Sequence, residues 1–414
     1  MDRKDIPAVV APNMGSFADG IKAFQTSEPP YGRGGGTPAT QFLAGRALEY
    51  LGKWTPDNKA FTPSISITPN GQAANHDLFR SLWGVDMVAS KHVFGTTTTA
   101  LNNTFARIGG QMGGSKLFWA DPCRTQDFIN QTTSKTKIWF VEAVSNPAGR
   151  VPDLENLSKA AKERDVMLVI DTTLGAGMPR FNALNYADAV TISLSKQAGG
   201  GDNKNMGGAI ITRGDFQWDD PVNQLTELRA YFEDQTTGKI AVPENPLAAL
   251  VKKIGVPEGT VCMAPEIALS IADSLPQVQS NVEKMCRNAR MIADLLKNHP
   301  KVKNVRLTGH NTDSENDERF REYFGDNHFV MMIDLKDNFK DATRHFIDSG
   351  ELLHAVVLGQ KETGISNPAT STHRQYSEEK LRSLGIYKDT IRMSVGTEDE
   401  DELGARVLAA LEHH

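Results

Sequence analysis

Short apolar runs alternate with amphipathic stretches along most of the chain, a pattern typical of an α/β protein. Segment 166–170, Val-Met-Leu-Val-Ile, is apolar throughout, as expected for a strand that is buried on both faces of a parallel sheet. The segment before it, 154–164, carries apolar residues on one helical face and predicts a βαβ unit. Together with similar runs, these segments predict one large and mostly parallel sheet, with strands at 64–67, 85–89, 138–142, 166–170, 189–193 and 208–212.

The second half of the chain has a different pattern. Residues 213–256 are polar and irregular, and we expect the boundary between two domains at their end. A long helical pattern at 265–298 follows, and Pro276 is expected to kink it. The rest predicts a smaller α+β domain with strands at 329–335, 355–358 and 390–395 and helices at 341–349 and from about 400.

Composition and charge exclude several classes of function. The 414 residues carry a formal net charge of −6, so neither nucleic acid nor an anionic membrane is an expected partner. No apolar run is long enough to span a bilayer, and the first residues lack the apolar core of a signal peptide. The three cysteines are widely spaced and predict neither a disulfide framework nor a metal site. We therefore expect a cytoplasmic protein.

Two of the predicted strands lead to candidate catalytic groups. One ends at Asp171, at the carboxyl edge of the sheet, where α/β proteins bind ligands. The other leads to Lys196, in a turn with two serines and three glycines. Such a lysine alone is more often an ordinary solvated residue. Together with a carboxylate and hydroxyls, however, it meets the needs of pyridoxal 5'-phosphate: a Schiff-base lysine, a partner for the pyridine nitrogen, and phosphate ligands.

An N-terminal segment rich in proline and glycine, 29–38, carries Tyr31 and Arg33. It is either a linker or an arm that reaches into a site, including one of a neighbouring subunit, with Arg33 free to pair with a phosphate. The residues by themselves leave both interpretations open.

In order and spacing, these motifs resemble the pyridoxal-phosphate enzymes of cysteine and methionine metabolism, which include cystathionine γ-synthase, methionine γ-lyase and canavanine γ-lyase-type enzymes. The resemblance covers 31–411 and is closest to O-acetylhomoserine sulfhydrylase, through 70–74, 207–209 and 214–218. It implies the aminotransferase-like fold type I, with a large, mostly parallel sheet domain and a smaller α+β C-terminal domain. It also implies a homotetramer, built as a dimer of dimers. The expected organisation is an arm and helix contacting a neighbouring subunit at 1–60, a cofactor domain at 61–256 and a C-terminal domain at 257–412.

The resemblance also implies a role for each candidate residue. Lys196 would form the Schiff base and later move protons, and Asp171 would keep the pyridine nitrogen protonated. Asn146 would lie near the phenolic oxygen of the cofactor, and Arg392 would bind the carboxylate of a small amino-acid substrate. The implied phosphate ligands are the hydroxyls of Ser193 and Ser195, the backbone of Gly71 and Gln72, and Tyr31 and Arg33 from an adjacent subunit.

Departures from the family's motifs bear on the substrate. Phe94 stands where relatives have a ring-stacking tyrosine, so it can stack on the pyridine ring but has no hydroxyl. In relatives that tyrosine is assigned proton transfers to the leaving group or to the incoming amine. Three further positions depart: Thr172, segment 366–369, and Val357, which replaces a serine that often helps to bind the carboxylate.

The expected reaction begins with removal of the Cα proton by Lys196 and proceeds through a vinylglycine-type intermediate after the γ-substituent leaves. Without a general acid, a leaving group that needs a proton departs ~10²–10⁴-fold more slowly. Phe94 therefore favours elimination or replacement on an O-substituted homoserine-type amino acid, such as canavanine, over a methionine or cystathionine γ-lyase. The alternative is an O-acetylhomoserine sulfhydrylase that forms homocysteine. A protein that binds the cofactor without catalysis is disfavoured by Lys196, Asp171 and Arg392.

Overall fold

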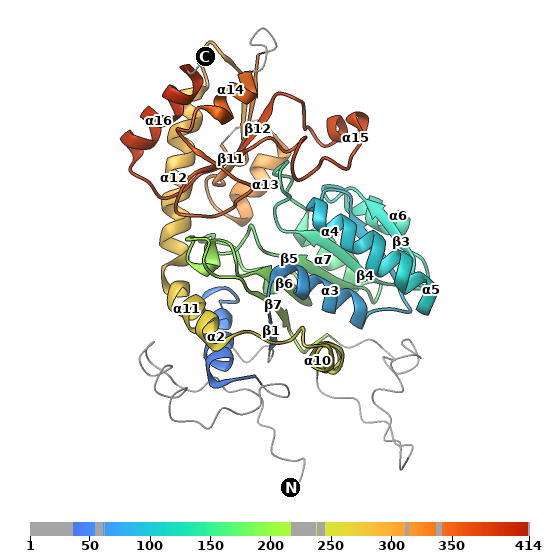
Figure 1. The fold of residues 1–414 in the computed structure, drawn as a ribbon. Coiled ribbons are helices and arrows are strands. Elements are labelled where there is room, and N and C mark those ends of the chain that lie inside the picture. The colour runs from blue at the N-terminus through green and yellow to red at the C-terminus, as the bar shows by residue number, and fades with distance from the viewer. Residues whose placement is uncertain are drawn as a thin grey trace.

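Two β-sheets flanked by helices form the framework of the molecule (Figure 1). The computed structural model describes residues 36–53, 61, 63–216, 237, 245–310, 314–336 and 342–412. The seven-stranded sheet has the order β1-β7-β6-β5-β4-β2-β3, and β7 alone runs against the other six strands. The predicted, mostly parallel sheet is confirmed. Its strands are β1 (Ser64–Thr68), β2 (Asp86–Ser90), β3 (Leu117–Ala120), β4 (Thr136–Glu142), β5 (Met167–Asp171), β6 (Ala189–Ser193) and β7 (Gly208–Thr212).

Helices cover both faces of this sheet, which explains why its central strands are apolar throughout. Along β4, Ile138 and Phe140 pack into the core on one face, whereas Trp139 and Val141 pack into the core on the other. The first face is covered by α3 (Gly71–Ser81), the π-helix Leu101–Gly109 and α10 (Pro246–Glu258). The second face is covered by α2 (Pro38–Tyr50), α6 (Thr125–Gln131), α7 (Leu154–Lys162) and α11 (Pro265–Ser274).

A broken helix connects the two sheets. α11 is separated from α12 (Val278–Leu296) by a 3-10 turn that contains Pro276, so the predicted kink is confirmed. α12 runs from the large sheet to the five-stranded sheet, whose order is β10-β11-β12-β9-β8 (Figure 1). Those strands are β8 (Val302–Leu307), β9 (Val330–Leu335), β10 (Leu353–His354), β11 (Gly364–Ser366) and β12 (Thr390–Ser394).

The smaller sheet has its own core, formed with α12, α14 (Ala342–Asp348) and α16 (Glu400–Glu412). No helix among the described residues combines the length and apolarity that a membrane span requires. The domain boundaries predicted above stay predictions. The remaining helices are α4 (Gly95–Ala100), α5 (Gly110–Gly113), α13 (Glu315–Tyr323) and α15 (Glu378–Ser383), with 3-10 turns at Ala183–Asn185 and Gln197–Gly199.

Two predictions for the second half of the chain are wrong. Residues 246–256, expected to be irregular, belong to α10, which the Asn245 side chain caps by accepting the Ala248 N–H at 3.1 Å. Residues 355–358, expected to form a strand, follow the two-residue strand β10 and leave the sheet. The valines there have high strand propensity, but the tertiary environment directs the backbone of this segment towards the site instead.

Trp139 offers a test of the core. Its side chain is fully buried, packs edge-on against Phe128 at 5.4 Å and donates its indole N–H to Thr132 Oγ1 at 3.0 Å. Trp139→Ala is expected to lower the free energy of unfolding of the apoprotein by about 3–5 kcal/mol. Denaturant unfolding would measure the loss. Trp119→Ala, on the partly exposed edge strand β3, is the control, and an equal loss there would contradict the burial argument.

Candidate active site

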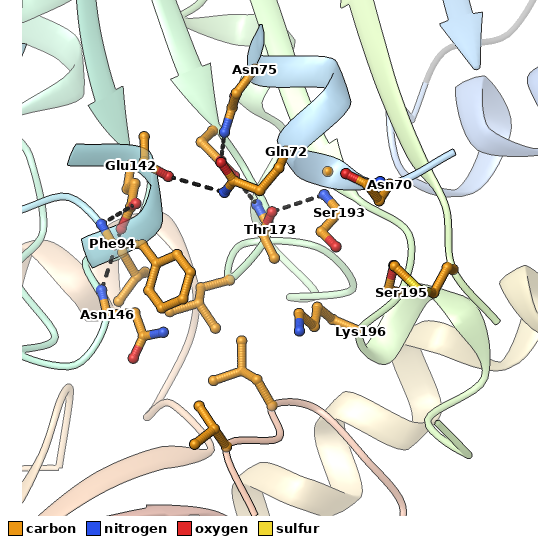
Figure 2. Close-up of a pocket in the computed structure, with 18 of the residues that line it drawn as sticks. Asn70, Gln72, Asn75, Phe94, Glu142, Asn146, Thr173, Ser193, Ser195 and Lys196 are labelled. Atoms are coloured by element: carbon orange, nitrogen blue, oxygen red, sulfur yellow. Dashed lines mark hydrogen bonds between the residues drawn. The ribbon is translucent and has the colours of Figure 1, made fainter. Parts of the chain in front are cut away.

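A pocket of about 370 Å³ lies at the carboxyl ends of β4, β5 and β6 (Figure 2). It also includes residues of β12 and the 355–358 segment, so it lies between the two sheets. Tyr31 and Arg33 lie outside the described residues, and their role stays a prediction, as does the homotetramer. The structure brings together the other predicted site residues, which are Gly71, Gln72, Phe94, Asn146, Asp171, Ser193, Ser195, Lys196 and Arg392.

Asp171, the last residue of β5, is held in place by two uncharged donors. Its Oδ1 accepts the Thr173 N–H at 2.9 Å, and its Oδ2 accepts from the Asn75 side chain at 3.2 Å (Figure 2). Burial raises the pKa of Asp171, and the hydrogen bonds from Thr173 and Asn75 oppose that rise. A cationic N–H placed against this carboxylate would therefore complete its electrostatic environment.

The start of α3 lies against the end of β6. Asn70 caps the helix by accepting the Ala73 N–H at 2.8 Å, and the first helical residue is Gly71. A Cβ on Gly71 would lie 2.6 Å from Cβ and 2.9 Å from Cα of Ser193, so only glycine allows this approach. The first N–H groups of an eleven-residue helix, next to a serine, are suited to a phosphate.

Lys196 and Ser195 occupy the turn after β6. The Ser195 hydroxyl accepts the Gly207 N–H at 3.0 Å and donates to the Gly207 carbonyl at 3.2 Å, which fixes the turn. Its predicted role in phosphate binding would require that hydroxyl proton to turn away from Gly207. Burial and the positive charge of Arg392 lower the pKa of Lys196. The neutral amine, the form that attacks an aldehyde, is therefore more available than on a solvated lysine.

Phe94 and Asn146 form the wall opposite Lys196 (Figure 2). Phe94 precedes α4 with a non-helical backbone, and its ring lines the pocket. Both residues donate their backbone N–H groups to Glu142, the last residue of β4, at 2.6 Å and 3.3 Å. Burial and the neighbouring charge of Asp171 raise the pKa of Glu142 well above its ordinary value.

Arg392 reaches the pocket from β12 and is 1 % exposed. Its Nη2 donates to the Val357 carbonyl at 2.6 Å and its Nη1 to Asn146 Oδ1 at 3.4 Å. Its Nε has no partner among the described residues, and burial lowers the pKa of Arg392 to about 10. A buried guanidinium with an unused donor that lines a cavity is suited to a carboxylate ligand.

Three residues that the sequence analysis did not assign to the site help to build it. Asn75 lies four residues after Gly71 on α3, so helical periodicity places both on one side. Thr173 binds Asp171 through its N–H and accepts the Ser193 N–H on Oγ1 at 2.9 Å, which connects β5 to β6. Glu142 ends a buried strand beside Asp171, and that position was the available signal.

These groups fit pyridoxal phosphate, the cofactor expected from the sequence. Asp171 lacks a cationic partner among its hydrogen-bond donors, and a protonated pyridine nitrogen would supply one. The start of α3 with Ser193 forms a cradle that a single Cβ would fill, and it suits a phosphate. Lys196 lines the same cavity, and the ring of Phe94 is available for stacking.

Comparisons with known proteins agree with this fit. Residues 62–412 match the family model of Cys/Met metabolism PLP-dependent enzymes. O-acetyl-L-homoserine sulfhydrylase 1 of Thermus thermophilus is 29% identical over 353 residues, which cover 83% of this chain and 81% of that protein. L-methionine gamma-lyase of Fusobacterium nucleatum is 25% identical over 332 residues, which cover 80% of this chain and 74% of that protein.

Solved structures are similar over almost the whole chain. A putative O-acetylhomoserine (thiol)-lyase from Campylobacter jejuni, with N'-pyridoxyl-lysine-5'-monophosphate, superposes with a TM-score of 0.79 at 25% identity. The match covers 97% of this chain and 93% of that chain. Cystathionine gamma-lyase from Lactobacillus plantarum has a TM-score of 0.74 at 20% identity, covers 94% and 89% of the two chains, and shows the fold alone.

Gly71→Ala tests the phosphate cradle. The added Cβ would force α3 away from Ser193, and overpacking of this kind costs about 1–3 kcal/mol. We expect the affinity of the apoprotein for pyridoxal phosphate to fall by about tenfold or more, measured by titration of the visible absorption band. Gly404→Ala is the control, because its Cβ would meet ordinary contacts at 3.7 and 3.8 Å. Unchanged affinity in Gly71→Ala would refute the cradle.

Proposed function

The chain belongs to the Cys/Met metabolism PLP-dependent enzyme family, and within it we propose that the enzyme breaks a Cγ–O bond of an O-substituted homoserine. Its fold is that of fold type I enzymes, and pyridoxal 5'-phosphate is its cofactor. Its reaction class is elimination or replacement at the γ-carbon. The observation that carries the choice of substrate is Phe94, which lines the pocket without a hydroxyl.

The residues around the cofactor divide the work. When bound, pyridoxal phosphate supplies an electron-accepting ring that makes the Cα proton of an amino acid acidic. Lys196 would take that proton and move protons at Cβ, a task that suits an amine whose pKa is lowered. Arg392 would bind the substrate carboxylate, with Asn146 and the Val357 carbonyl fixing its guanidinium. Asp171 would hold the ring nitrogen in its protonated form.

The absence of a phenol limits the leaving group. No tyrosine is among the described residues that line the pocket, so the acid that would protonate a departing thiolate is missing from this wall. Acetate and hydroxyguanidine are more stable leaving groups than a thiolate, so their departure depends less on that proton. An oxygen-linked γ-substituent is therefore the substrate class that these residues favour.

The names of the relatives favour replacement by sulfide. O-acetyl-L-homoserine sulfhydrylases are found among them from Thermus thermophilus and Leptospira meyeri. We therefore place first the reaction in which the Cγ–O bond of O-acetylhomoserine breaks, acetate leaves, and hydrosulfide forms the new Cγ–S bond of homocysteine. Elimination on a canavanine-like substrate comes second and rests on Phe94, because none of the reported names refers to it.

Product analysis distinguishes these reactions. The holoenzyme would be incubated with O-acetylhomoserine, canavanine, methionine or cystathionine, with and without sulfide, and 2-oxobutyrate, homocysteine and the leaving groups would be quantified. We expect homocysteine and acetate from O-acetylhomoserine plus sulfide. If canavanine were the only one of these substrates to be turned over, the result would support elimination on a canavanine-like substrate. Methionine or cystathionine as the fastest substrate would overturn the argument from Phe94.

Phe94→Tyr tests the same argument from the enzyme's side. Because the new hydroxyl can protonate a thiolate, we expect methionine cleavage to rise by about tenfold or more, whereas turnover of O-acetylhomoserine changes little. Steady-state kinetics on both substrates would measure the change in their ratio. Phe94→Leu is the control that removes the ring without adding a hydroxyl. An equal rise in methionine cleavage with leucine would show that the hydroxyl is not the cause.

A further inference from the structure

We propose that Glu142 is a positioning residue that fixes two walls of the pocket at once, by accepting the backbone N–H groups of Phe94 and Asn146. The inference concerns the cofactor site and does not depend on which γ-substituent the enzyme removes. It assigns a task to a buried carboxylate that the reaction itself does not use.

The geometry of Glu142 is that of a clamp with two separate acceptors. Oε1 accepts the Phe94 N–H at 2.6 Å, and Oε2 accepts the Asn146 N–H at 3.3 Å. Figure 2 shows both bonds converging on this one side chain. Glu142 is 7% exposed and ends the central strand β4, so its carboxylate has a rigid base.

The two donors lead to the two groups that the site must orient. Phe94 lies just before α4 with φ −54° and ψ 142°, and no side chain caps that helix. Glu142 therefore fixes the backbone from which the ring of Phe94 projects. Asn146 in turn accepts from Arg392 Nη1 at 3.4 Å. One carboxylate thus connects the ring that would stack on the cofactor with the guanidinium that would bind the substrate.

A carboxylate at this place is electrostatically expensive, which argues for a specific task. Glu142 and Asp171 are paired residues on the adjacent parallel strands β4 and β5, and both lie in a poorly solvated environment. Well-packed apolar residues usually cost less at a buried site than a charged group does. An apolar side chain, however, would leave the N–H groups of Phe94 and Asn146 without their acceptor.

Two substitutions separate the clamp from bulk stability. Glu142→Ala removes both acceptors, and a displacement of about 1 Å at a reacting centre can cost about 100-fold, so we expect kcat/KM to fall by about that factor. Glu142→Gln keeps one carbonyl acceptor and should lose about tenfold. Readouts without substrate are the visible circular dichroism of the bound cofactor and hydrogen exchange at the Phe94 and Asn146 amides. Both are expected to change in the order Ala, Gln, unsubstituted enzyme.

Asp86→Asn is the matched control. Asp86 is also a buried carboxylate, accepting the Lys116 N–H at 3.0 Å and the Thr133 hydroxyl at 2.9 Å, but it stands at the opposite end of the sheet, where β2 begins. The substitution Asp86→Asn should lower the melting temperature and leave the dichroism of the cofactor and kcat/KM unchanged.

The proposal is overturned if the Glu142 variants only melt earlier, with unchanged dichroism and unchanged amide exchange. It is also overturned if Asp86→Asn alters the dichroism as much as they do. If Glu142→Ala does not fold, Glu142→Gln, which preserves volume, decides by the same two substrate-free readouts. Because these readouts need no turnover, an error in the proposed substrate would not affect them.

Discussion

The active site depends on one constraint: the carboxyl ends of β4, β5 and β6 must lie side by side in register. Glu142 is paired with Asp171, and Asp171 with Thr191, two residues before the end of β6. The hydrogen bond from Ser193 N–H to Thr173 Oγ1 continues this edge. The strands are buried on both faces, and each face packs into a different core. A shift of one residue would move every side chain of a strand to the other face and so into the wrong core. Packing of the sheet therefore holds the polar groups in place.

Ionisable side chains are concentrated in the pocket, where a charged ligand can pair with them. One cavity is lined by Asp171, Glu142, Lys196 and Arg392. Burial raises the pKa of the two carboxyl groups and lowers the pKa of Lys196 and Arg392, so in each case it favours the neutral form. In the proposed arrangement, Asp171 would hold the cationic pyridine nitrogen of pyridoxal phosphate and the start of α3 would hold its anionic phosphate. The protein is thus pre-organised for a ligand that carries both.

The smaller sheet contributes Arg392, the proposed ligand of the substrate carboxylate, to the pocket. Arg392 belongs to β12. Its guanidinium is fixed by the Val357 carbonyl and by the side chain of Asn146, which follows β4 of the large sheet. The Val357 side chain offers no hydrogen bond, but the Val357 backbone carbonyl accepts one from Arg392. Through Asn146 and Glu142, the guanidinium of Arg392 is connected to the same wall that carries Phe94, so this wall would also orient a substrate carboxylate in the proposed function.

Six of the seven strands of the large sheet, the kink at Pro276 and the meeting of Asp171 with Lys196 could be predicted from the sequence, because burial period and strand ends are local properties. The sequence did not predict the edge strand β3, the turn at 355–358 or the helix α10. Nor did it predict the bonds that Asn75, Thr173 and Glu142 make. Those depend on strand order and on which backbone N–H groups lie within reach. The tertiary fold sets these bonds, because a hydrogen bond between distant segments leaves no periodic signal in the chain.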